Sequence, residues 1–266
     1  MRWEAEDKDR HVAIEYMRWP EIRERIADGH DTAVFSVGAI EQHGPHLPSN
    51  VDELLGSEFA LELARRLGRA LMAPTIRPGV SPQHIEFPGT ITLRSETLKL
   101  LIEDYVHSLV RHGFRRVVVI SAHFGNRSTV ELACQHLQEE LGERAVIVPI
   151  YSLMAYVPRD ERFAGLLEGF HANNFETSLV LHLAPQVVDM AAASPGGVYP
   201  PAVDPFIARM QQTVKAFSPS GVLGHPDLAS PELGRDVFAA MIDNLAREVE
   251  VITRFLEDAR SSSPRE

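Results

Sequence analysis

The sequence predicts an α/β fold, a three-layer sandwich in which a mostly parallel central sheet is flanked by helices. Between residues 31 and 183, apolar runs of β-type residues alternate with amphipathic helical stretches, a pattern typical of strands joined through covering helices. Polar, glycine-containing loops follow the ends of at least two of these runs. The 266 residues can bury a large core without disulfides, so we expect one domain over residues 1–258 and a disordered tail over 259–266.

The individual elements follow from the spacing of apolar residues. Buried strands are expected over residues 32–40, 71–76, 116–121 and 145–150. Helices with one apolar face are expected over residues 52–67, 95–112, 128–141, 176–183 and from 231 to about 257. Ser95 is the expected cap of its helix. Residues 194–224 are rich in Pro and Gly, which predicts an irregular segment around one short helix near residues 206–217.

The composition excludes several kinds of partner. The formal net charge of -11 argues against nucleic acid, whose binding requires clustered Lys and Arg. No apolar run approaches the roughly 18 residues of a membrane-spanning helix, and the polar amino terminus does not resemble a secretory signal. Cys134 is the single cysteine, so no disulfide can form within the chain. We therefore expect a cytoplasmic protein with a small-molecule substrate and no membrane or nucleic-acid partner.

The densest group of chemically active side chains follows the first predicted strand. Glu41, His43 and Asp52 are potential metal ligands within twelve residues, with His46 as a possible fourth. Glu41 and His43 are two residues apart, so in an extended segment they point to the same side. Asp52 begins the next helix, where it can also act as a cap. Two carboxylates with one or more imidazoles suit Zn, Mn or Fe, and His46 is equally compatible with a ligand, a support or a substrate contact.

Two further clusters lie downstream. His123, Gly125 and Asn126 follow the strand over residues 116–121, at the sheet edge where open parallel sheets bind ligands. His171 and Glu176 lie in the segment HANNFETS, which opens a predicted helix. Glu176 in the first turn of that helix is compatible both with a role at the helix terminus and with a metal ligand, and periodicity does not separate the two.

At these segments the sequence resembles the creatininase family of metal-dependent amidohydrolases. The family hallmark, Gly-x-x-Glu-x-His-Gly-Pro-His-Leu-Pro followed by Asp, is reproduced nearly in full over residues 38–52. Further matching motifs follow in order over residues 84–90, 121–126, 171–178 and 221–230. The resemblance spans about residues 30–250 and implies the creatininase-like form of the predicted sandwich.

The resemblance also implies roles for individual residues. Glu41 would bind one metal ion, His43 and His123 the other, and Asp52 would bridge both. A hydroxide that bridges the two ions would be the nucleophile, since paired divalent ions lower the pKa of a shared water and polarise a carbonyl. His171 would match the proton shuttle that donates to the departing nitrogen. Two divalent ions per chain are thus expected, Zn together with Mn, Fe or a second Zn.

The sequence departs from creatininase itself at one ligand. Gly125 stands where that enzyme has a Glu two residues after the His of its second motif. Glu176 is the candidate replacement, because its motif resembles that of relatives in which this Glu faces the metals. Substrate contacts are expected from His46, Phe124 and Asn126.

A second departure concerns the substrate. Creatininase closes on its ring with tryptophans, whereas this chain has only Trp3 and Trp19, both before the first strand, which argues against creatinine as the substrate. Other aromatic residues could form an apolar lid or simply pack in the core and on the surface. They are Phe124, Tyr151, Tyr156, Phe170 and Phe175.

The sequence-based hypothesis is therefore a hydrolase of an amide, formamide or cyclic amide C–N bond in a small polar metabolite. One alternative keeps the metals but cleaves a carbon–carbon bond of an inositol-derived cyclic ketone, or trims a peptide. Another alternative is a non-catalytic member of the family that only binds metal or ligand. The joint presence of the five residues with implied roles argues against it; they are Glu41, His43, Asp52, His123 and His171. By resemblance, the protein is expected to be a homo-oligomer, as hexamers are common in the family.

Overall fold

The computed structural model describes residues 11–166, 169–197 and 212–262 of the chain. Its centre is a four-stranded sheet in the order β2-β1-β3-β4, with all neighbouring strands parallel. The strands are β1 (Thr32–Val37), β2 (Ala70–Met72), β3 (Arg116–Ser121) and β4 (Val146–Ile150). The predicted fold class is confirmed, and the carboxyl ends of the two central strands, β1 and β3, lie next to each other.

Alternate residues of each strand enter different cores. Val34, Val118 and Val148 pack into one hydrophobic cluster, whereas Phe35 and Val119 pack into the other. Because both faces of the sheet are buried, its strands consist almost entirely of apolar residues. This is why the strands were visible in the sequence as continuous apolar runs.

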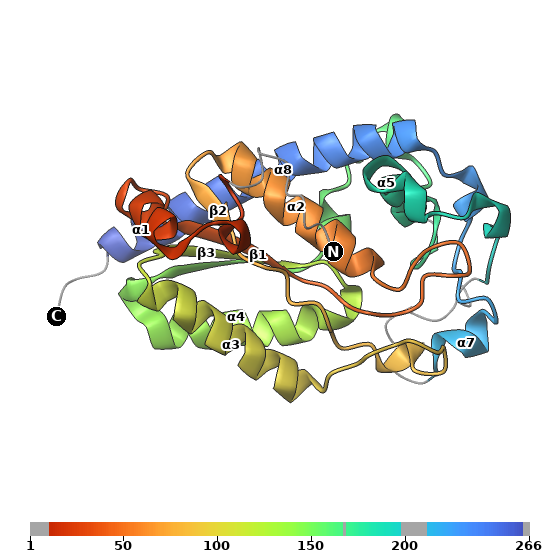
Figure 1. Cartoon of the computed structure of the whole chain (residues 1–266), viewed down its shortest axis with the longest axis horizontal. Coiled ribbons are helices and arrows are strands. Elements are labelled where there is room, and N and C mark those ends of the chain that lie inside the picture. Colours follow the sequence, from red (N-terminus) through yellow and green to blue (C-terminus); the bar gives the residue numbers. More distant parts are fainter. Residues whose placement is uncertain (1–10, 167–168, 198–211, 263–266) are drawn as a thin grey trace.

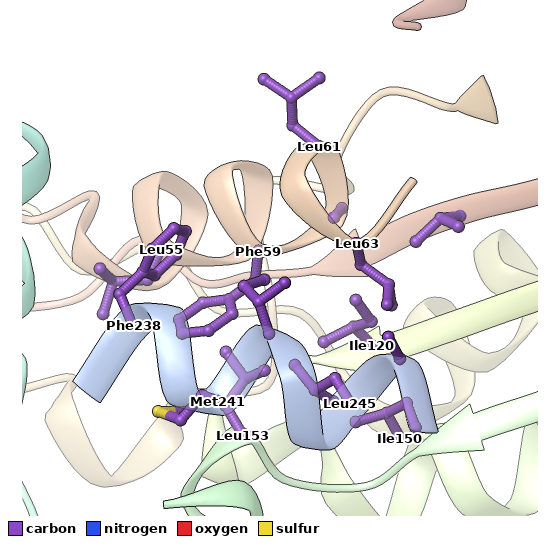
Figure 2. Close-up of a cluster of buried hydrophobic side chains, with 14 of the residues drawn as sticks. Leu55, Phe59, Leu61, Leu63, Ile120, Ile150, Leu153, Phe238, Met241 and Leu245 are labelled. Carbon is purple, nitrogen blue, oxygen red and sulfur yellow. The ribbon is translucent and has the colours of Figure 1, made fainter. Parts of the chain in front are cut away.

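Helices cover both faces of the sheet (Figure 1). On one face lie α2 (Val51–Leu67), α5 (Asn174–Leu183) and the long α8 (Pro231–Ser262), and on the other lie α3 (Ser95–Arg111) and α4 (Arg127–Leu141). Figure 2 shows the first of these cores between α2 and α8, where the rings of Phe59 and Phe238 meet with centroids 4.6 Å apart. These layers hold the ends of the central strands rigidly.

Shorter elements complete the described chain. They are α1 (Trp19–Ala27), α7 (Val214–Phe217) and 3-10 turns at Ile14–Tyr16, Pro82–His84, Phe124–Asn126, Gly142–Arg144, Leu153–Tyr156, Glu161–Phe163, Pro185–Val187, Met190–Ala192 and Pro226–Leu228. No helix among the described residues combines the length and the apolar character needed to cross a membrane.

Several predicted boundaries need correction. β2 is shorter than predicted: it ends at Met72, and the chain meets β1 again at Ile76, whose N–H donates to the Ser36 carbonyl oxygen over 2.9 Å. Ser95 is the first residue of α3 rather than its cap, and Arg94 precedes it without a side-chain capping bond. The helix α8 extends to Ser262 rather than ending at about residue 257, and the disordered tail expected over residues 259–266 stays a prediction. Residues 263–266 of that tail, and residues 206–211 of the predicted short helix, lie outside the described residues.

We expect Phe59→Ala to lower the free energy of unfolding by about 3–5 kcal/mol, because the side chain is fully buried and its loss leaves a cavity between α2 and α8. Urea unfolding measures the change. Leu132→Ala is the matched control, since Leu132 on α4 is 55% exposed and should change stability by no more than about 0.5 kcal/mol. Equal effects of the two changes would contradict the packing described here.

Candidate metal centre

The loop after β1 folds back on itself and brings two carboxylates together. The Glu41 N–H donates to the Ser49 carbonyl oxygen over 2.9 Å, and His43 pairs with Leu47 across a tight turn. Gly44 makes this turn possible, because its φ is +71° and a Cβ there would lie 2.5 Å from a side-chain carbon of Val222. The chain then enters α2, whose first turn carries Asp52.

The loop after β3 carries His123 and is held by Asn126. The Asn126 amide nitrogen donates to the carbonyl oxygens of Val37 (3.2 Å) and Gly38 (2.8 Å), and its oxygen accepts from the Val80 N–H (2.8 Å). All of these contacts are with the main chain, and Asn126 is fully buried. Asn126 therefore joins the ends of β1 and β3 to the loop at residue 80. These contacts use its side-chain amide and do not favour the predicted substrate contact, which stays a prediction.

The third part of the site is the start of α5. Ala172 has a φ of +51°, a left-handed conformation that is uncommon outside glycine, and it follows His171 directly. Asn173 is the helix cap, since its side-chain oxygen accepts from the Glu176 N–H over 3.2 Å. One carboxylate oxygen of Glu176 accepts from the Ala172 N–H over 2.5 Å. Glu176 thus supports the start of α5 while its carboxylate also lies among the histidines of the site.

These three segments place their side chains in two neighbouring groups. His123 Nδ1 lies 3.4 Å from Glu41 Oε1 and 3.3 Å from Asp52 Oδ2. His43 Nε2 lies 3.7 Å from Asp52 Oδ1. A ligand atom of His43 also lies within 4.8 Å of ligand atoms of His171 and Glu176. The grouping differs from the one implied by the family resemblance, because His123 converges with Glu41 rather than with His43.

Hydrogen bonds to the main chain prepare three histidines for a metal. His43 Nδ1 lies 3.2 Å from the Glu41 carbonyl oxygen, His123 Nε2 lies 3.1 Å from that of Val80, and His171 Nε2 lies 2.6 Å from that of Gln42. A carbonyl oxygen can only accept, so each of these ring nitrogens carries the proton. The other nitrogen of each ring faces the cluster and is the atom that would bind a metal once the ring is neutral, which is the arrangement usual for metal-binding histidines.

Unpaired polar atoms also indicate a cation. Both carboxylate oxygens of Glu41, Oδ2 of Asp52 and Nε2 of His43 are buried and have no hydrogen-bond partner among the described residues. Such atoms are costly to bury unless something compensates them. A divalent ion would pair with all of them, and carboxylate and imidazole together are a ligand set that Zn and Mn accept. The residues present therefore fit a metal centre.

The pKa shifts reflect the same close packing of charges. Burial raises the pKa of Glu41 to about 7, with the Asp52 carboxylate adding to the effect and His123 opposing it. Burial lowers the pKa of His43, but the Asp52 carboxylate overrides this and raises it to about 10. Asp52 in turn is held below its ordinary pKa by His43 and His123 against the effect of burial. The chain itself thus favours positive charge beside Asp52.

Sequence reasoning missed two members of the site. His84 Nε2 lies 3.2 Å from Glu41 Oε1, and Gln42 contacts both His84 and His171. His84 begins one of the matching motifs and Gln42 lies inside another. The motifs therefore pointed to both residues, but the sequence alone indicated no chemical role for either. His46 is buried, contacts Thr177 Oγ1 over 2.9 Å, and is not among the described residues that line the pocket. This position agrees with the supporting role that the sequence left open, and its substrate contact stays a prediction.

A pocket opens onto the cluster and is partly apolar. Phe124, Phe170 and Phe175 line it together with Glu41, Asp52, His123, His171 and Glu176, which leaves Phe124 in a position to contact a substrate. Tyr151 and Tyr156 instead line a separate groove that runs between α4 and α8. Of the five aromatic residues considered for a lid, three therefore border the site.

Comparison with known proteins identifies the family. The family model described as creatininase, creatinine amidohydrolase, matches residues 15–249. The chain belongs to the creatininase family. Creatininase relatives include creatinine amidohydrolase of Pseudomonas putida, which is 31% identical over 88% of this chain and 95% of its own length. The mycofactocin precursor peptide peptidase of Mycobacterium tuberculosis is 34% identical over 81% of this chain and 83% of its own.

Solved creatininase structures share the fold. A manganese form of creatininase has a TM-score of 0.74 at 29% identity, covering 90% of this chain and 97% of that one. A creatininase variant of Zn–Zn type also has a TM-score of 0.74, at 31% identity. A more distant relative is 3-dehydro-scyllo-inosose hydrolase of Thermotoga maritima, 26% identical over 92% of this chain. The protein is therefore a metal-dependent hydrolase of this family.

We expect Asn126→Ala to lower the free energy of unfolding by about 2–3 kcal/mol and to weaken metal binding, because Val37, Gly38 and Val80 would lose their buried hydrogen-bond partner. Chemical unfolding and zinc titration measure the two effects. Asn244→Ala is the control: Asn244 also donates to a main-chain oxygen, that of Tyr156, but neither residue lines the pocket at the centre. It should cost about 1 kcal/mol and leave zinc binding unchanged.

Proposed function

We propose that the protein hydrolyses an amide, formamide or cyclic amide C–N bond of a small polar metabolite with two divalent ions. The observation that carries the proposal is the convergence of two buried carboxylates with three histidines, each of which holds one ring nitrogen on a main-chain carbonyl and turns the other towards the cluster. A site that only needed to be stable would not place unpaired charges in its interior.

The grouping of the side chains supports one assignment of ligands. Glu41, Asp52 and His123 would hold one ion, since their atoms lie within 4.8 Å of one another. His43 and Glu176, whose ligand atoms lie close together, would hold the other. Asp52 would contribute to both, because its Oδ1 lies 3.7 Å from His43 Nε2 and its Oδ2 lies 3.3 Å from His123 Nδ1. Asp52 is thus the shared ligand. Zinc is the expected metal, with Mn, Fe or a second Zn as its companion.

Gly125 supports the role of Glu176. A Cβ at residue 125 would lie 2.3 Å from His123 Nε2 and 2.4 Å from the Val80 carbonyl oxygen. No side chain fits there without moving the main chain that holds His123. The ligand that creatininase takes from this loop must therefore come from elsewhere, and Glu176 is the remaining carboxylate of the cluster.

The chain's own residues would handle substrate and proton. When bound, paired divalent ions lower the pKa of a shared water and polarise the carbonyl of an amide. His171 keeps its Nε2 proton on the Gln42 carbonyl, so Nδ1 is the atom that accepts a proton and passes it to the departing nitrogen. Burial, with the nearby His43 and His84, lowers the pKa of His171, which keeps this nitrogen free to accept. Phe124 and Phe170 would position the apolar part of the substrate.

A peptide-trimming activity is a second candidate, favoured by the 34% identity to the mycofactocin precursor peptide peptidase. The zinc-loaded protein should be tested on formamides, cyclic amides, short peptides and cyclic ketones. Release of an amine or ammonia from the first two groups would support the proposal. Cleavage of peptides alone would favour the second candidate, and cleavage of cyclic ketones alone would move the activity to a carbon–carbon bond.

Elemental analysis should find about two metal ions per chain in the protein purified without chelators, and about one in Glu176→Ala, because the Glu41 group keeps all its members. Glu139→Ala, a change of an exposed glutamate on α4, is the control and should keep both ions. If Glu176→Ala also keeps both, Glu176 acts only at the start of α5.

His171→Gln should lower turnover by about 10²–10⁴-fold while metal content stays the same, because the proton carrier is lost but the ligands remain. Asp52→Asn is the contrasting variant and should lose both metal and turnover, since it removes the shared ligand. Steady-state kinetics on the best substrate and metal analysis of the same samples separate the two effects. Parallel loss of metal and turnover in His171→Gln would make His171 a ligand instead.

A further inference from the structure

His84 is bound differently from the other histidines of the centre. His43, His123 and His171 each donate a ring N–H to a main-chain carbonyl, as described above. His84 instead contacts a side chain, with Nδ1 lying 3.0 Å from Nε2 of Gln42. Both residues are buried, so water does not compete for this contact. The position of the His84 proton therefore depends on Gln42.

The orientation of the Gln42 amide follows from its neighbours. Its Oε1 lies 2.8 Å from the Gly44 N–H, which can only donate, so the oxygen is at this end. The amide nitrogen then lies 3.0 Å from His84 Nδ1 and 3.3 Å from the Gly221 carbonyl oxygen. Its two protons satisfy these two acceptors. An amide N–H cannot accept, so Nδ1 of His84 must be the acceptor and is unprotonated.

The amide nitrogen has a third neighbour, His171 Nε2, at 2.9 Å. That ring nitrogen donates to the Gln42 carbonyl oxygen over the shorter distance of 2.6 Å. Both atoms of the 2.9 Å contact are then donors, so we assign the two amide protons to the other two neighbours. Gln42 thus acts on two histidines in different ways. Its main-chain carbonyl accepts the hydrogen bond from His171 Nε2, and its side-chain amide determines which nitrogen of His84 is protonated.

The consequence appears at Glu41. With Nδ1 unprotonated, the neutral His84 ring carries its proton on Nε2, which lies 3.2 Å from Glu41 Oε1. The contact lacks the alignment of a full hydrogen bond, since Glu41 Oε1 has no such partner among the described residues. It still turns the positive end of an N–H dipole towards a buried carboxylate oxygen.

We infer that Gln42 is a positioning residue whose side chain keeps the proton of His84 on Nε2, so that His84 supports Glu41 and is excluded from the metal ligands. The inference deepens the proposed two-metal function and rests on it. The inference also excludes one possible metal site, because Glu41, His84 and His171 lie close enough together to hold an ion. With Nε2 protonated, His84 offers that group no lone pair.

Gly221 keeps the Gln42 amide in place. Its φ is +82°, and a Cβ there would lie 1.9 Å from Gln42 Oε1. Any side chain at residue 221 would displace the amide from His84. The segment over residues 221–230, which the sequence analysis singled out without a role, thus acts on the centre through this one backbone position.

The test is nitrogen NMR of the full-length, ¹⁵N-labelled protein at one neutral pH, in its metal-free and zinc-loaded forms. Two-bond proton–nitrogen spectra distinguish a protonated ring nitrogen from one with a lone pair, and the spectrum of His84→Asn assigns the His84 signals. We expect Nε2 protonated and Nδ1 unprotonated for His84 in the wild type. In Gln42→Glu, the new carboxylate oxygen can only accept, so His84 Nδ1 should acquire a proton.

His171 is the internal control, because the main chain of residue 42 sets its proton and should do so in every variant. Gln42→Met removes the amide without adding charge and should leave His84 in a mixture of its two neutral forms. Zinc affinity should fall about 10–100-fold in Gln42→Glu. Protonated Nδ1 in the wild type, or an unprotonated Nδ1 in Gln42→Glu, would overturn the inference.

The metal-free spectra keep the inference separate from the proposed function. If the protein binds no zinc but His84 behaves as expected, the two-metal proposal fails and the role of Gln42 stands. If zinc binds and His84 does not respond to Gln42→Glu, the proposal stands and the role of Gln42 fails. If Gln42→Glu does not fold, Gln42→Met provides the test, and a His84 that stays wholly in the Nε2-protonated form would contradict the inference.

Discussion

The structure around the centre depends on two carboxylates held inside the protein. Glu41 and Asp52 are 0% and 3% exposed, at the point where the chain leaves β1 and enters α2. Removing ionised groups from water is expensive unless opposite charge and hydrogen bonds replace the water. The buried negative charge must be compensated by positive charge or hydrogen bonds. The neighbouring histidines, the loops that hold them and a bound metal ion are the groups that can provide this.

The main chain does most of the positioning. The carbonyl oxygens of residues 41, 42 and 80 each accept a hydrogen bond from a different histidine ring. Because the path of the backbone decides which nitrogen is protonated, the chemistry of the rings is fixed by the loops that leave the sheet. Gln42 and Asn126 extend this control, one by its amide contact with a ring and the other by joining strand ends.

Much of this arrangement could be predicted from the sequence, and the exceptions have physical causes. Glu41, His43 and Asp52 could be found because they are neighbours in the chain and follow a continuous apolar strand. The partner of His123 could not, because two strands and several loops decide which carboxylate it meets. The main-chain bonds of Asn126 could not be predicted either, because the sequence does not reveal whether an amide is already satisfied by the main chain, and its substrate contact stays a prediction. Oligomeric state and location in the cell stay predictions.

The division of ligands between the two groups has a consequence for the order in which the chain is made. Glu41, Asp52 and His123 all lie in the first half of the sequence, together with the central strands that position them. The second group contains Glu176, which is added more than fifty residues after His123. On a ribosome, the growing chain would therefore, under the proposed assignment of ligands, carry all the donors for one ion well before it has the last donor for the other.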